Sequence, residues 1–136
     1  MSTSQKATFT VSGRTENAVT TAAKTTYDDN TNAVKIADGG TNGSILTALH
    51  ATPRATATAS NLQLYVSPDN GTTMQLVETV LMAAHTVAAT TAIPSTSFEK
   101  PSLTTPIFFE NGSSLWVGAA VALADGVVFT GTVEDY

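Results

Sequence analysis

Two histidines, His50 and His85, are the side chains of this sequence best suited to proton transfer or metal binding near neutral pH. They stand in different segments, and neither has a second histidine or a cysteine close by in the chain. A catalytic triad or a metal site would therefore need partners that only the fold could bring in. The sequence favours a structural or surface role for both histidines.

Two short clusters of Asp and Asn could offer oxygen ligands to calcium. Residues 28–32 read Asp-Asp-Asn-Thr-Asn, and residues 69–71 read Asp-Asn-Gly. The helix-flanked loop of the common calcium motif surrounds neither cluster. Asp, Asn and Gly at this density are typical of turns, because Asp and Asn bond to nearby backbone and Gly accepts positive φ. We expect turns at both places and no metal.

Other candidate chemistry is weaker still. The glycine-rich segment 38–43 lacks the Gly-Lys-Ser/Thr ending of a phosphate loop. Ser12 and Ser114 have no neighbouring base pattern that would activate a nucleophile. The paired carboxylates at 28–29 and 134–135 read as surface turns or chain end, where a glycosidase would place its pair across a cleft. The sequence predicts a protein that is not an enzyme and needs no cofactor.

Three aromatic residues, Phe108, Phe109 and Trp116, favour binding to another macromolecule, since aromatic side chains often anchor interfaces. Phe108 and Phe109 are adjacent, so in a strand they must face opposite sides. One of the two must therefore leave the core, where it either packs under a loop or meets a partner subunit.

The composition is poor in charge and rich in threonine. Of 136 residues, 42% are hydrophobic and 12% charged, and the chain holds 25 Thr and 20 Ala. Threonine suits strands because its branched Cβ fits a pleated surface. A surface with so little charge is expected to be covered in an assembly.

Charge and cysteine content exclude several classes. The net charge is -5, and the six basic residues are scattered singly, which argues against direct nucleic-acid binding. With no cysteine there is no disulfide framework and no thiolate chemistry. The polar start after Met1 is unlike a signal peptide, and the longest apolar stretch, Val117 to Ala124, is too short to cross a bilayer. We expect synthesis in the cytoplasm and no membrane partner.

Alternating apolar and polar residues predict β-strands and hairpins. Residues 62–66 and 74–81 alternate on either side of a Pro-Asp-Asn-Gly turn and predict a hairpin. Residues 106–109 and 115–117 flank Glu-Asn-Gly-Ser and predict a second one. Residues 126–133 predict a last strand.

The first half of the chain is less regular. Residues 7–11 and 33–37 predict short strands, and 18–27 could form another, with a helix as the weaker alternative. Residues 45–51 fit a buried strand or a short helix, and flanking turn residues favour the strand. Residues 83–105 carry prolines and predict a long connection or an edge.

These segments predict an all-β protein with an N-terminal arm at residues 1–6 and a single antiparallel β-sandwich at residues 7–136. About eight strands with one long crossover are typical of Greek-key and jelly-roll sandwiches. The expected core is Phe9, Val34, Ile36, Leu46, Leu62, Leu64, Val66, Leu76, Val80, Ile107, Leu115, Val117, Val121, Val127 and Phe129.

Residues 61–136 resemble a known class of proteins. A strand carrying Leu-Tyr-Val (64–66) precedes an Asp-Asn-Gly-Thr turn (69–72), and an Asn-Gly-Ser-Ser-Leu turn (111–115) precedes Trp-Val before a last strand ending in Glu-Asp-Tyr (134–136). This pattern is similar to small virion structural proteins of tailed bacteriophages, namely capsid decoration (cement) proteins and related head-fibre, neck and tail accessory proteins.

The resemblance implies a non-enzymatic role in the virion after synthesis in the host cytoplasm. A decoration protein would bind the major capsid protein or other virion proteins, bridge neighbouring subunits and stabilise the shell, with a homotrimer favoured at a threefold site. By type, the partner-binding residues would be Phe108, Phe109 and Trp116, together with the N-terminal arm. The arm consists of Ser2, Thr3, Ser4, Gln5 and Lys6.

One alternative is a carbohydrate- or receptor-binding module, such as a fibre tip, that stacks sugars on Trp116, Tyr65 or Tyr27. It predicts an exposed aromatic side chain in a concave site, whereas the decoration hypothesis predicts aromatic side chains at subunit contacts. A small hydrolase is the remaining alternative, and no arrangement of base and nucleophile in the sequence favours it.

Overall fold

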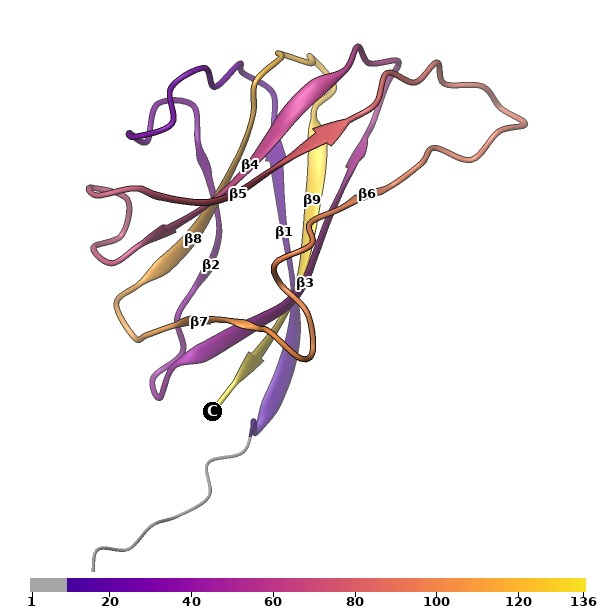
Figure 1. Cartoon of the computed structure of the whole chain (residues 1–136). Coiled ribbons are helices and arrows are strands. Elements are labelled where there is room, and N and C mark those ends of the chain that lie inside the picture. Colours follow the sequence, from indigo (N-terminus) through magenta and orange to yellow (C-terminus); the bar gives the residue numbers. More distant parts are fainter. Residues whose placement is uncertain (1–9) are drawn as a thin grey trace, which may run out of the picture.

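The computed structural model describes residues 10–136, which form two antiparallel sheets packed face to face (Figure 1). This part of the chain contains nine strands and no helix, so the predicted β-sandwich is confirmed. No helix in the described residues is long and apolar enough to span a membrane. The strands are β1 (Ser12–Thr20), β2 (Val34–Asp38), β3 (Ser44–Pro53), β4 (Ser60–Ser67), β5 (Gln75–Met82), β6 (Thr96–Ser97), β7 (Ile107–Phe109), β8 (Ser114–Ala119) and β9 (Val127–Asp135).

The strands pair as one long hairpin folded back on itself. β4 pairs with β5, β3 with β6 and β7, β2 with β8, and β1 with β9. These pairs are shared between a sheet in the order β1-β9-β3-β6, with β7 also on β3, and a sheet in the order β2-β8-β4-β5. We call them the first and the second sheet. Because β6 and β7 together take the place of one strand, this nested order is the eight-strand jelly roll.

The innermost hairpin, β4–β5, is where the sequence predicts it. Asn70 and Gly71 in its turn both have positive φ, 57° and 101°. Ser67 Oγ accepts the backbone N–H of Gly71 at 2.6 Å, and Asp69 Oδ1 accepts that of Thr73 at 2.7 Å. Local turn chemistry therefore closes this hairpin.

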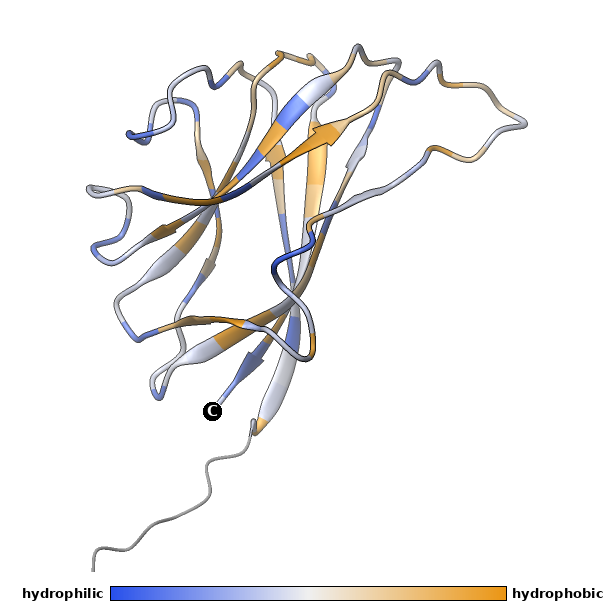
Figure 2. Cartoon of the chain, viewed as in Figure 1, coloured by the Kyte–Doolittle hydropathy of each residue, from blue (hydrophilic) through white to orange (hydrophobic). Residues whose placement is uncertain are grey.

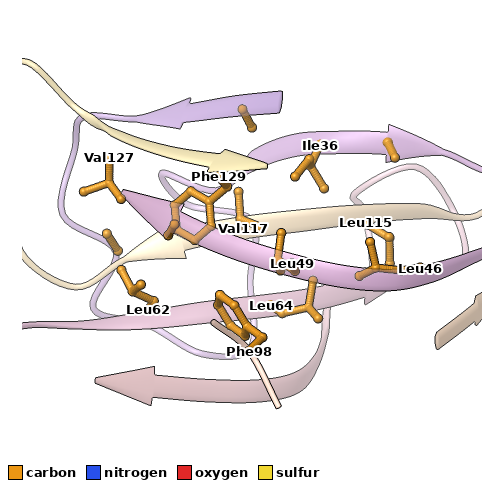
Figure 3. Close-up of a cluster of buried hydrophobic side chains, with 14 of the residues drawn as sticks. Ile36, Leu46, Leu49, Leu62, Leu64, Phe98, Leu115, Val117, Val127 and Phe129 are labelled. Atoms are coloured by element: carbon orange, nitrogen blue, oxygen red, sulfur yellow. The ribbon is translucent and has the colours of Figure 1, made fainter. Parts of the chain in front are cut away.

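The core fills the space between the two sheets (Figure 3). Phe129 on β9 and Phe98 after β6 lie with their ring centroids 6.3 Å apart, and both are buried. Alternate residues of each strand face this layer, as the pleat requires. The fully or nearly buried members predicted from the sequence are Ile36, Leu46, Leu62, Leu64, Leu115, Val117, Val127 and Phe129.

Two residues predicted to be in the core are exposed, and four others are only partly buried. Leu76 is 42% exposed, because a bulge between Leu64 and Tyr65 places it opposite Tyr65 on the outer side of the second sheet. Val121 is 41% exposed, since β8 ends at Ala119. Val34, Val66, Val80 and Ile107 are half-buried against the core. Phe9 lies outside the described residues.

Some predicted strand boundaries are also wrong. The first described strand begins at Ser12, where the sequence predicts the end of a strand over 7–11, and residues 7–9 lie outside the described part. β1 ends at Thr20, so the expected strand over 18–27 is realised only in its first residues.

The predicted hairpin of 106–109 with 115–117 does not form. β7 pairs with β3 in the first sheet, and β8 pairs with β2 and β4 in the second. The turn at 110–113 therefore carries the chain across the sandwich. In contrast, residues 45–51 are a strand, and residues 83–105 form a connection with a short edge strand, both as predicted.

Candidate partner-binding surfaces

The two adjacent phenylalanines point in opposite directions, as predicted. Phe109 on β7 is 2% exposed and belongs to the core, whereas Phe108 is 53% exposed. Of this pair, only Phe108 is available to a partner. Its ring packs on that of Tyr136, with the centroids 6.2 Å apart.

Phe108 lies at the end of the sandwich where the described chain begins and ends. Figure 1 shows the start of β1, the C-terminus and β7 together at this end. The Val11 N–H donates to the Asp135 carbonyl at 2.7 Å, and the Tyr136 N–H donates to the Gly43 carbonyl at 3.1 Å. Val11 is 82% exposed. We call Val11, Phe108 and Tyr136 the terminal patch.

An ion-pair network fixes the backbone behind the terminal patch. Arg14 Nε donates to Asp135 Oδ2 at 3.0 Å and its Nη2 donates to Asp135 Oδ1 at 3.2 Å, a bidentate pair between β1 and β9. The Ser44 hydroxyl also donates to Asp135, which ties in β3. The hydrogen bond from Ser44, followed by that from Arg14, lowers the pKa of Asp135. Three strands are thus joined at this end.

Trp116 is far from this patch in the fold, because β8 belongs to the other sheet. It is half-buried on the outer side of the second sheet, opposite Tyr65. Its Nε1 donates to Ser114 Oγ at 2.8 Å. A β-carbon added at Gly71 would stand 2.6 Å from Trp116 Cζ2, so the β4–β5 turn rests on the indole. The three aromatic residues that were predicted together as partner-binding residues therefore lie in different places: Phe108 on the surface, Phe109 in the core and Trp116 on the other sheet.

A buried lysine, Lys24, lies on this outer side of the second sheet, and the sequence analysis did not predict it. Lys24 is fully buried, although it follows β1 in an irregular segment. Its Nζ donates to the carbonyls of Asp29 and Thr31 at 2.7 and 3.1 Å, and to Asp29 Oδ1 at 3.1 Å. It also lies 5.1 Å from the ring centroid of Tyr65. Lys24 thereby fastens residues 24–31 over the sheet.

The polar groups beneath Lys24 are satisfied by one another. Gln63 Nε2 donates to the Lys24 carbonyl at 3.1 Å, and the Tyr65 hydroxyl lies 3.1 Å from Gln63 Oε1. Burial raises the pKa of Tyr65. A β-carbon at Gly118 would stand 2.7 Å from both Gln63 Oε1 and Lys24 Cδ, so only glycine fits under this network. Because Tyr65 is fully buried, a sugar cannot stack on it.

The Asp/Asn clusters form turns, as predicted. Asp29 accepts hydrogen bonds from the Thr26 hydroxyl, Lys24 Nζ and the Thr31 N–H, and the first two lower its pKa to about 2. Hydrogen bonds chiefly from Thr73 lower the pKa of Asp69. Within residues 10–136, no three His, Cys, Asp or Glu side chains are grouped so that they could hold a metal ion.

The two histidines are separated in the fold. His50 is exposed on the outer side of β3. His85 follows β5, exchanges two backbone hydrogen bonds of 2.9 Å with Ala57, and has a buried Nε2 without a partner among the described residues. The predicted arm, Ser2 to Lys6, lies outside the described residues.

No family model, no curated protein and no solved structure matches this chain. Its function is therefore argued from its own exposed residues. The terminal patch is the surface that unites an aromatic predicted to bind a partner with the point where the chain enters the sandwich.

Proposed function

We propose that this chain is a non-enzymatic virion structural protein of a tailed bacteriophage, a capsid decoration protein that binds the head shell through its terminal patch. The observation that carries the proposal is the exposure of Phe108 at 53% on the end that also holds Val11 and Tyr136. Exposed apolar side chains gathered at one end of a domain form a surface that a partner can cover.

The rigidity of this end supports a binding role. The Arg14–Asp135–Ser44 network joins β1, β9 and β3 directly behind the patch. Residues that are held in place before binding lose less conformational entropy when they bind. A patch on three joined strands is therefore suited to a lasting contact.

The N-terminal arm would act with the patch. The described chain starts at residue 10, next to Val11, so residues 2–6 are connected to this end by only a few residues. In the proposal, the arm reaches onto a neighbouring capsid subunit while the patch binds the first one. Such a two-part contact would bridge subunits and stabilise the assembled shell by mass action.

The jelly-roll fold is compatible with this role but does not select it, because viral capsid proteins and lectins both use it. The sugar-binding alternative has less support from the described side chains. Tyr65 is buried, and Trp116 is half-covered and bonded to Ser114. Tyr27, 41% exposed and bonded to Asn61 through its hydroxyl, is the stacking group that remains to this alternative.

Binding to expanded shells of the encoding phage tests the proposal. Purified wild type, Phe108→Ser, and a chain lacking residues 2–6 are titrated onto shells and separated by sedimentation. Leu81→Ser is the matched control, because Leu81 is 68% exposed but lies on β5 in the other sheet. Thermal unfolding of each variant shows that the domain is folded.

We expect Phe108→Ser to weaken shell binding by about thirty-fold or more, the loss typical of an aromatic hot spot. Deletion of residues 2–6 should weaken it further, and Leu81→Ser should leave it unchanged. Equal binding by Phe108→Ser and wild type would contradict the role given to the patch.

A further inference from the structure

Five places in the chain carry Asn or Asp directly before Gly, the arrangement in which the backbone most easily attacks an Asn or Asp side chain. The attacking atom is the glycine nitrogen, which loses its proton and closes a five-membered ring on the side-chain carbon Cγ. Glycine favours this closure because it has no Cβ in the way. The five pairs are Asp38-Gly39, Asn42-Gly43, Asn70-Gly71, Asn111-Gly112 and Asp125-Gly126.

Hydrogen bonding separates four of these pairs from the fifth. A glycine N–H that donates to an acceptor holds its nitrogen away from the side chain before it and keeps its proton more firmly. In contrast, the Gly112 N–H donates to no group within residues 10–136. The other four glycines donate at 2.6 to 2.9 Å: Gly39 to the Ser113 carbonyl, Gly43 to the Gly40 carbonyl, Gly71 to Ser67 Oγ and Gly126 to the Leu123 carbonyl.

The turn at 110–113 explains why Gly112 differs. The Ser113 N–H donates to the Glu110 carbonyl at 3.0 Å, and Gly112 has a φ of 91°. A turn closed by this bond, with positive φ at its second central residue alone, is of type II. The closing bond uses the N–H of Ser113, so the N–H between the two central residues is left to water.

The surroundings of Asn111 leave room for the ring to close. Asn111 and Gly112 are both exposed. Apart from the two residues beside Gly112 in the chain, no heavy atom lies within 4 Å of the place where a β-carbon on it would stand. Figure 2 shows the colour changing from orange along β7 to blue at the start of this turn, where the chain meets water. Asn70, in contrast, is held by Lys35, whose Nζ donates to Asn70 Oδ1 at 3.0 Å.

We propose that Asn111 is a site of spontaneous deamidation, to which the fold directs this modification among the three Asn-Gly pairs. The Gly112 nitrogen gives its proton to a base from the solvent and bonds to Asn111 Cγ. The bond from Cγ to Nδ2 then breaks, and the nitrogen takes up protons from the solvent and leaves as ammonia.

Water opens the resulting succinimide at either of its two carbonyl carbons. Opening at one yields aspartate, and opening at the other yields isoaspartate. Each event therefore consumes one water, releases one ammonia and adds one negative charge to the net charge of -5.

The product changes the end of the sandwich that carries the terminal patch. β7 ends at Phe109, which pairs with Ser44, and Ser44 also pairs with Asp135 near the C-terminus. The turn follows β7 at this same end (Figure 1). Isoaspartate puts one extra carbon into the backbone and so lengthens the turn that carries the chain across the sandwich. Deamidation depends only on this turn, so it proceeds whether or not the terminal patch binds a shell.

The test compares the three Asn-Gly pairs within one chain. The purified protein is kept in mildly alkaline buffer well below its unfolding temperature, and samples are digested in mildly acidic buffer at intervals. Peptide masses give the conversion at Asn42, Asn70 and Asn111. The same protein unfolded in guanidinium chloride gives the rate that each sequence has without the fold. Asn111→Gln is the matched control, because glutamine keeps the amide but would need a six-membered ring, which closes more slowly.

In the folded protein, Asn111 should convert at least about five- to tenfold faster than Asn42 and Asn70, the factor that corresponds to releasing one backbone hydrogen bond. In guanidinium chloride the three sites should convert at similar rates. Asn111→Gln should remove the change at position 111 and leave the slow rates at the other two sites as they are. Equal rates at the three sites of the folded protein would overturn the proposal. So would an unchanged Asn111 after a time in which the unfolded chain has converted.

Discussion

Replacing Lys24 by alanine should destabilise the protein, although the residue lies outside the strands, in the segment that follows β1. The side chain is fully buried over Tyr65 and donates three hydrogen bonds to Asp29 and Thr31. Alanine removes three methylene groups, each contributing about 0.8 kcal/mol when buried. The three hydrogen bonds stabilise the wild type by roughly 1 kcal/mol each. The wild type also bears the cost of removing the ammonium from water, and the variant does not, so this cost offsets part of the loss.

The expected loss is therefore about 2–4 kcal/mol in the free energy of unfolding. Urea unfolding followed by the fluorescence of Trp116 measures it, since this is the single tryptophan and lies in the same sheet. Lys24→Met separates packing from charge, because methionine keeps most of the stem. We expect Lys24→Met to lose less than half of what Lys24→Ala loses.

A change below about 0.5 kcal/mol for Lys24→Ala would refute this reasoning, because a loss that small is typical of an exposed side chain. It would mean that residues 24–31 are not fastened to the sheet through this lysine. Equal losses for Lys24→Ala and Lys24→Met would instead assign the stabilisation to the hydrogen bonds.

Two further predictions rest on the described contacts. Phe109→Ala should cost about 3–5 kcal/mol of stability and Phe108→Ala less than about 1, because only Phe109 is in the core; equal losses in urea unfolding would contradict the assignment. Stability should be highest above about pH 4 and fall as the pH drops toward 2, because the lowered pKa values of Asp29, Asp69 and Asp135 favour the folded state only while these carboxylates are ionised. Thermal unfolding across this range measures the effect, Asp135→Asn should reduce it, and a flat profile would contradict it.

The sequence predicts strands well where local turn chemistry decides them. The β4–β5 hairpin follows from alternation around Pro68 to Gly71, and Asn70 and Gly71 take the positive φ that the turn requires. The opposite directions of Phe108 and Phe109 follow from the pleat alone. Both results depend only on neighbouring residues.

Pairing between distant strands is harder to predict. The turn at 110–113 has the composition of a hairpin turn, yet it joins β7 in one sheet to β8 in the other. In a jelly roll this connection must cross the sandwich, because β7 pairs with β3 in the first sheet and β8 pairs with β2 in the second. That constraint comes from the nesting of the whole chain and has no local signature.

The candidate surfaces were predictable in part. The pleat predicts that Phe108 and Phe109 face opposite sides, but it does not predict which of the two is exposed. The closeness of Phe108 to the chain start depends on pairings between residues far apart in sequence, such as Val11 with Asp135. Lys24 lies in a run of Ala and Thr that gives no sign of burial, and its acceptors are backbone carbonyls, which no sequence pattern marks.

The most direct test of the central claim is the solution mass of the wild-type protein, measured by light scattering with and without expanded shells of the encoding phage. The account predicts a stable oligomer that co-sediments with shells and saturates at a fixed ratio to capsid subunits. A protein that stays free in solution at every shell concentration would contradict it.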